Sequence, residues 1–257
     1  MFVFVISSGK DHLSVADLLV HLANSLISKE RYHDALEKLK EALRIFRIHF
    51  KPDNDYVIQT TDRLIDVFIS VNEYESALPL ILDVIETKAR VYGEENESLC
   101  NSLYELGSIY DRLNEMPSAA NAYEKSLHIK RILVGNNSTE VARALNNLGA
   151  ILDDVGEPEK AEPLYREALQ IYREAYGSEH HDVALSLNNL AALLDDRGEY
   201  LVAKDMYEEA LLITKTVFGE KSIEAASALI CVARCCNDCI IWCGYVISIC
   251  FLQLLFL

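Results

Sequence analysis

The sequence predicts an all-α solenoid, a stack of antiparallel helix pairs, and three observations support this fold class. Alanine returns every 42 residues, at Ala35, Ala77, Ala119, Ala161 and Ala203. Leucine keeps the same spacing, at Leu22, Leu64, Leu106, Leu148 and Leu190, and glycine keeps it at Gly9, Gly93, Gly135, Gly177 and Gly219, with Lys51 in the place between the first two. A fixed period of roughly 20 to 50 residues is typical of one helical unit that is repeated and stacked, rather than of a globular domain with a central pocket.

The segment 136–177 shows how one unit is expected to fold. Ser138 or Thr139 is suited to cap a first helix, and apolar residues then recur at spacings of three and four, at Val141, Leu145, Leu148, Ile151 and Leu152. Gly156 and Pro158 predict a turn into a second helix. Its inner side carries Ala161, Leu164, Tyr165, Ala168, Leu169 and Tyr172. Two such helices cannot bury their apolar faces alone, so neighbouring units must stack.

The 42-residue register places the remaining elements in order. Residues 1–9 are expected to end a preceding second helix, and 220–238 to form the first helix of a sixth unit. The pattern fails in the tail 239–257, where Ile240 replaces the turn glycine and Tyr245 the alanine. Between these ends lie five full units, 10–51, 52–93, 94–135, 136–177 and 178–219.

The pattern L-G/A-x2-Y/L, then G-x-Y/P-x2-A, then Y-x2-A-L resembles the tetratricopeptide repeat. The stretch LNNLGAILDDVGEPEKAEPLYREALQIYREAYG, with its 42-residue spacing, is similar to the long variant of kinesin light chains and nephrocystin-type proteins. The resemblance implies a right-handed superhelical solenoid in which first helices line a concave groove and second helices form the outer wall. It also implies that the groove holds a peptide segment of another protein.

The same resemblance points to groove residues on two first helices. Asn147 and Asn189 resemble asparagines that grip the backbone of an extended peptide in kinesin light chains, and a side-chain amide offers both a donor and an acceptor for that task. Asn146 and Asn188 either share this role or lie at the seam between helices. Arg143 corresponds to a basic groove position of that family.

Carboxylates recur late in these two helices, as Asp153 and Asp154 and as Asp195 and Asp196. Kinesin light chains that hold tryptophan-acidic cargo peptides need basic residues there, so this chain departs from them. Two interpretations remain open: a groove that prefers peptides with lysine or arginine, and aspartates that only keep the surface soluble.

Composition limits the partners. The 257 residues include 24 lysines and arginines against 40 aspartates and glutamates, a net charge of −16. Such a chain disfavours nucleic acid and anionic lipid and favours a basic protein or peptide. The sequence contains no H-E-x-x-H, G-x-S-x-G or glycine-rich phosphate loop, so neither an enzyme nor a bound cofactor is expected.

The apolar stretch 240–257 allows a membrane anchor, a misassigned end of a truncated array, or an unusual cap helix. It reaches only the lower length limit for spanning a bilayer and lacks a basic flank. Cysteines crowd this end, but no returning pair completes a zinc site, so no metal is expected. With one cysteine in five units, the array is expected in a reducing cytoplasm.

The sequence therefore predicts a protein-interaction scaffold or adaptor that captures a peptide segment in its groove. One alternative is a kinesin light chain-like cargo adaptor for a microtubule motor. Another is a tail-anchored membrane assembly scaffold, which requires that residues 240–257 be a genuine anchor.

Overall fold

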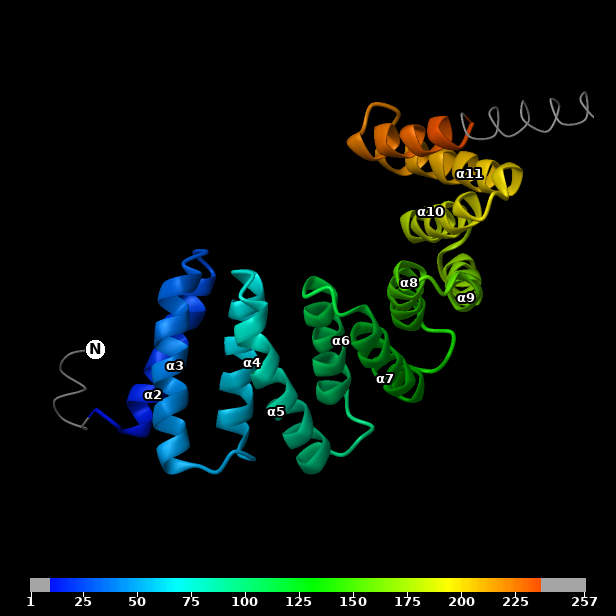
Figure 1. The fold of residues 1–257 in the computed structure, drawn as a ribbon. Helices are drawn as coiled ribbons and strands as arrows, with labels where there is room; N and C mark the ends of the chain where they lie inside the picture. Colours follow the sequence, from blue (N-terminus) through cyan, green and yellow to red (C-terminus); the bar gives the residue numbers. More distant parts are fainter. Residues whose placement is uncertain (1–9, 237–257) are drawn as a thin grey trace, which may run out of the picture. The chain divides into compact units, whose positions relative to one another are not determined.

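A computed structural model describes residues 10–236, and every regular element within that range is a helix (Figure 1). Helices of 15 to 19 residues follow one another through short connections. Their bounds are α2 Leu13–Ile27, α3 Tyr32–His49, α4 Asp55–Ser70, α5 Tyr74–Tyr92, α6 Glu97–Arg112, α7 Met116–Val134, α8 Thr139–Asp154, α9 Pro158–Tyr176, α10 His181–Asp196 and α11 Tyr200–Phe218. Residues 223–236 are also helical. The all-α repeat solenoid that the sequence predicts is confirmed.

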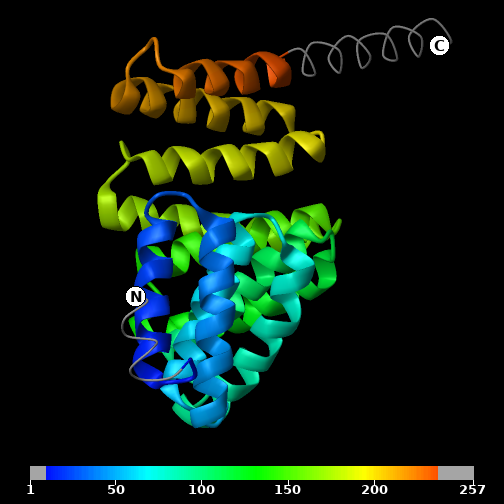
Figure 2. The same cartoon turned by 90° about the vertical axis from the view of Figure 1, so that its left-hand side faces the viewer.

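The helices divide into two compact units, one before and one after the boundary between Leu133 and Val134. In the first unit α3 packs on α2 and on α4, and α5 packs on α4 and on α6. In the second unit α9 packs on α8 and on α10, and α11 packs on α10. Figure 2 shows α10, α11 and the helix 223–236 as successive layers of the second unit. The first helices are the even-numbered ones, and the second helices are the odd-numbered ones.

Each first helix begins with a capping side chain at the same place in the 42-residue period. The caps are His12, Asn54, Asn96, Ser138 and His180. Each accepts a hydrogen bond from the backbone amide two residues further on, at N···acceptor distances of 2.7 to 3.2 Å. These bonds satisfy amides that have no partner inside the helix. Of the two candidates that the sequence offers for α8, Ser138 is the cap.

The turn inside each helix pair places one residue in the left-handed backbone region. Gly156 and Gly198 hold it in the second unit, with φ of 83° and 81°. Glu30, Asn72 and Asn114 hold the same position in the first unit, with φ of 58° to 61°. Glycine adopts this conformation without steric penalty, and asparagine adopts it more readily than most residues. The turn geometry is thus conserved along the chain while its residue type is not.

The periodic small residues lie where paired helices approach each other. All five alanines from Ala35 to Ala203 are fully buried. Gly149 of α8 faces the ring of Tyr165 so closely that a Cβ atom there would lie 2.7 Å from it. Gly107 meets Tyr123 in the same way, whereas α10 carries Ala191 at this position. These residues serve packing, as the sequence predicts.

Candidate peptide-binding surfaces

The two asparagines that the sequence predicts to contact a peptide backbone lie at equivalent, partly exposed positions. Asn147 is on α8 and Asn189 is on α10, 42 residues apart, and both are half-buried. They belong to the first helices of the second unit. The surface that the first helices form within each unit is here called its first-helix face, with α2, α4 and α6 in the first unit and α8 and α10 in the second. Neither residue is fully buried, as contact with an extended ligand requires.

The neighbouring Asn146 lies instead in the interface between α8 and α10. Only 4% of its surface is exposed, and its Nδ2 donates to Ser186 Oγ at 2.8 Å. Its Oδ1 is buried without a hydrogen-bond partner among the described residues. Of the two roles that the sequence leaves open, the seam between helices is the one observed, and a ligand has no access to this side chain.

Ser186→Ala is expected to lower the free energy of unfolding by about 2 kcal/mol. The buried amide of Asn146 would lose its hydrogen-bond acceptor, and an unsatisfied buried polar group is costly. Urea unfolding followed by circular dichroism measures this effect. Ser178→Ala, at an exposed loop position, serves as the control and should change stability by less than about 0.5 kcal/mol. Equal stability of the two variants would contradict the prediction.

Asn188 lines a hollow between α10, α11 and the helix 223–236. The hollow has a volume of about 220 Å³, and its wall includes Leu185, Tyr207 and Arg234. The Oδ1 atom of Asn188 is buried and has no partner among the described residues. Asn188 therefore lies between α10 and the following first helix, the place equivalent to the seam of Asn146, and is half-buried beside this hollow.

Arg143 is exposed near the start of α8. It lines a hollow of about 130 Å³ together with Tyr172, Tyr176 and Asp182. The pKa of Tyr172 is raised to about 12, by burial first and then by Asp182, while the Arg143 charge opposes them. At the equivalent place in α10 the side chain is Leu185, so the basic position does not recur.

The recurring aspartates separate into accessible and inaccessible members. Asp154 and Asp196 are exposed, and Asp153 is half-buried, with its pKa raised by burial first and then by Asp196 and Asp154. Asp195 is only 6% exposed, and its Oδ2 lies 3.9 Å from Arg234. The carboxylates of α8 and α10 thus form one acidic surface from which Asp195 is withdrawn.

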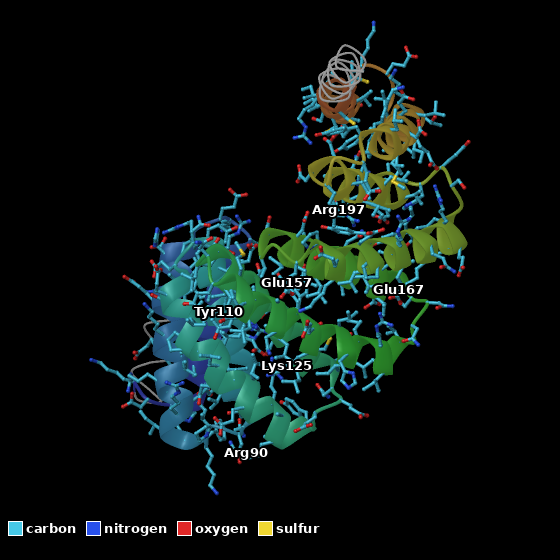
Figure 3. All side chains as sticks on the ribbon, turned by 45° about the vertical axis from the view of Figure 1, so that its right-hand side comes forward. Arg90, Tyr110, Lys125, Glu157, Glu167 and Arg197 are labelled. Carbon is cyan, nitrogen blue, oxygen red and sulfur yellow. The ribbon has the colours of Figure 1, made fainter. Side chains whose placement is uncertain are left out.

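The nearby arginine does not neutralise this surface. Arg197, labelled in Figure 3, follows α10 directly. Its guanidinium donates to Glu162 of α9 at 2.5 Å and lies 3.1 Å from Glu199. Because Arg197 is engaged with these two glutamates, Asp154 and Asp196 keep their charge available to a ligand.

The first unit carries a second acidic group on its first helices, and its member Glu105 was not predicted from the sequence. Burial, then Asp66, then Asp62 raise the pKa of Glu105 to about 7, and Lys88 opposes them. The pKa of Asp66 is also raised, by burial first and then by Asp62. The period offered a signal, since Glu105 of α6 stands 42 residues before Asn147. These residue types do not recur, so the pattern alone did not single them out.

Lys88 of α5 is the cation within this group. Its side chain is 3% exposed, and its Nζ donates to Asp62 Oδ1 at 2.8 Å and to Ser102 Oγ at 2.7 Å. Asp62 and Ser102 stand 84 residues before Asn146 and Ser186. The seam between α4 and α6 thus uses a carboxylate, an ammonium and a hydroxyl where the α8–α10 seam uses one amide and one hydroxyl.

Comparison with known families decides what these helix pairs are. Profiles with the description "Tetratricopeptide repeat" match residues 15–55, 102–133 and 140–216, together more than half of the chain. The chain belongs to the tetratricopeptide repeat family. No curated protein matches it.

Solved tetratricopeptide structures share its fold. One contains the nearly identical TPR-like repeats assigned to a kinesin light chain of Podosopora anserina: it has a TM-score of 0.71 and 18% identity, and the match covers 82% of this chain and 99% of that one. BtubC (BKLC) from P. vanneervenii has a TM-score of 0.64 and 22% identity, and the match covers 88% of this chain and 82% of that one. A STAND protein with a tetratricopeptide repeat sensor from Pyrococcus horikoshii has a TM-score of 0.65 and 18% identity, and the match covers 83% of this chain and 31% of that one.

The tetratricopeptide fold makes this chain a protein-interaction scaffold, a kind of fold that is typically not enzymatic. Among residues 10–236, no helix is long and apolar enough to cross a membrane. The same residues hold no cluster of side chains suited to a metal ion. The apolar stretch 240–257, on which the anchor and cap interpretations depend, lies outside the described residues, as does the segment 1–9.

Proposed function

We propose that this tetratricopeptide protein is a scaffold or adaptor that binds a peptide segment of another protein along its first-helix face. The single observation that carries the proposal is the pair Asn147 and Asn189, which present partly exposed amides at the same position of two adjacent first helices. Amides spaced in this way match the repeating donors and acceptors of an extended peptide backbone, whatever its side chains.

The charge of the same face favours a peptide with lysine or arginine. In the second unit Asp153, Asp154 and Asp196 stand on α8 and α10, and in the first unit Asp66 and Glu105 stand on α4 and α6. Burial raises the pKa values of Asp153, Asp66 and Glu105 first, and neighbouring carboxylates raise them further, so like charges lie close together at these positions. A ligand cation placed among them relieves that repulsion and steers association.

The test measures binding of a labelled, lysine-containing peptide and of its glutamine and glutamate versions by fluorescence anisotropy. The double variant Asn147→Ala and Asn189→Ala is expected to bind the lysine peptide about thirtyfold more weakly, since each of two lost hydrogen bonds is worth about 1 kcal/mol. Asn121→Ala and Gln170→Ala, exposed amides of α7 and α9, are the matched controls.

The two parts of the proposal fail in different ways. Unchanged binding by the double variant would contradict capture on the first-helix face. Equal affinity for the lysine and glutamine peptides, with no dependence on salt, would contradict the preference for basic peptides while leaving the asparagine contacts in place.

A kinesin light chain-like cargo adaptor is the second candidate. The fold likeness to the Podosopora anserina repeats favours it, whereas the aspartates of α8 and α10 stand where that type needs basic residues for tryptophan-acidic peptides. A tryptophan-containing acidic peptide that binds through Asn147 and Asn189 better than the lysine peptide would favour this candidate and overturn the basic-peptide preference.

A further inference from the structure

A hollow lies between the second helices α3 and α5 of the first unit, with α4 as its floor, and is here called the α3–α5 hollow. Its volume is about 430 Å³. Apolar side chains form much of its wall, among them Leu43, Leu64, Phe68 and Leu80. The hollow therefore offers an apolar surface to one inserted side chain of a partner.

Three basic residues of α3 stand along this hollow, and no acidic residue lines it. They are Lys40, Arg44 and Arg47, spaced so that they share one face of the helix. Lys40 Nζ lies 5.0 Å from the centre of the Phe68 ring. Arg44 already pairs with Glu41 at 2.8 Å and with Asp11. The lining of this hollow is therefore positively charged, although the chain as a whole has a net charge of −16.

Arg47 carries charge that no side chain of the described residues neutralises. It is exposed and makes no ion pair or hydrogen bond within residues 10–236. Its counterpart in α9, 126 residues later, is Arg173, which pairs with Glu209 of α11 at 2.6 Å. In the second unit this arginine is therefore paired with a glutamate of the neighbouring second helix, whereas Arg47 of the first unit has no such pair among residues 10–236.

The next hollow along the first unit has a similar build, with one basic residue in its wall instead of three. The α5–α7 hollow has a volume of about 420 Å³, and its wall includes Leu82, Tyr110 and Lys125. Figure 3 labels Tyr110 and Lys125. Leu82 stands at the place of Lys40, while Glu86 and Ala89 take the places of Arg44 and Arg47. The recurring shape follows from the fold, whereas the basic rim belongs to the α3–α5 hollow.

We propose that the α3–α5 hollow binds an acidic peptide segment of a partner protein. One apolar side chain of that segment enters the hollow, and flanking carboxylates pair with Lys40 and Arg47. The cations are spread over about 10 Å of helix, at 1.5 Å per residue, so they match carboxylates two to three residues apart in an extended peptide better than one compact phosphate. This surface is separate from the first-helix face and opposite to it in charge preference.

The experiment uses the full chain and a labelled peptide in which one leucine is flanked by glutamates. Arg47→Glu, alone and with Lys40→Glu, is expected to weaken binding at least about tenfold. Arg90→Glu makes the same charge change at an exposed arginine of α5 outside the hollow, and should change affinity by no more than about twofold. Glutamine in place of the glutamates, or glycine in place of the leucine, should weaken binding to a similar extent.

Several outcomes would overturn the proposal. Equal losses in Arg47→Glu and Arg90→Glu would show attraction to net charge rather than a site. Binding of a phosphoserine version through Arg47, without binding of the glutamate peptide, would assign the hollow to phosphate. Loss of binding in the Asn147→Ala and Asn189→Ala variant would place the acidic peptide on the first-helix face instead. Circular dichroism of each variant controls for folding.

Discussion

Lys88→Met is expected to lower the free energy of unfolding by about 3 kcal/mol, although methionine nearly matches the length and volume of the lysine side chain. The ammonium is buried between Asp62 of α4 and Ser102 of α6. Removing it leaves a carboxylate and a hydroxyl in the seam without their donor, and breaking a buried ion pair is strongly destabilising. Chemical unfolding followed by circular dichroism measures the loss.

A double-mutant cycle tests whether the loss belongs to the pair. Asp62→Asn should also destabilise, since it leaves Lys88 without its counter-charge. The two changes together should cost less than their sum by at least about 1.5 kcal/mol. The matched control is the exposed pair Arg173 and Glu209, whose side chains are 39% and 42% exposed and whose coupling should stay below about 1 kcal/mol. Additive losses at Lys88 and Asp62 would contradict this account of the seam.

Glu105→Gln is expected to stabilise the protein above pH 7 by up to about 3 kcal/mol. The pKa of Glu105 is about 7 in the folded chain against 4.5 as the ordinary value, chiefly because of burial and then because of Asp66 and Asp62. Between these two values the folded state binds more protons than the unfolded state, so wild-type stability falls as pH rises. Glutamine removes that dependence at this position.

The difference between wild type and Glu105→Gln should therefore shrink from pH 7 downward and vanish below about pH 4.5. Urea unfolding at a series of pH values measures it. Glu124→Gln, at an exposed position of α7, is the control and should follow the wild-type profile. A Glu105→Gln variant that is less stable than wild type at pH 8 would show that the carboxylate is stabilised by its surroundings, contrary to the raised pKa.

The helix pairs could be predicted because the features that specify them are local and periodic. Each alanine such as Ala161 is fully buried at the same place of its pair, and Ser138 caps the helix that follows it directly. Both requirements return every 42 residues, so five copies of the pattern reinforce one another. The turn position is equally local, although Glu30 fills it where glycine would fit better.

The candidate site could be predicted only in part, because it depends on packing between units. Asn146 and Asn147 are neighbours in sequence, and only the approach of α10 decides that Asn146 is covered while Asn147 stays partly open. Asp195 looks like Asp153 in the pattern, yet Arg234 from the following helix stands beside it. Lys88 stands at a position that Phe46 and Tyr172 occupy in other pairs, so the repeat pattern does not predict a buried lysine there.

The two polar seams have a consequence for how such an array grows. Asp62 with Lys88, and Asn146 alone, are each supplied by a single helix pair, and each reaches the same residue type, Ser102 or Ser186, on the first helix that follows. The serine does not recur in every pair, since α8 carries Ala144 and the helix 223–236 carries Ala228 at the same place of the period. A pair inserted between α9 and α10 would itself reach Ser186, but Asn146 would then face the first helix of the inserted pair and would lose its hydrogen bond unless that helix carried a hydroxyl there. The buried polar groups therefore restrict the order in which these pairs can follow one another.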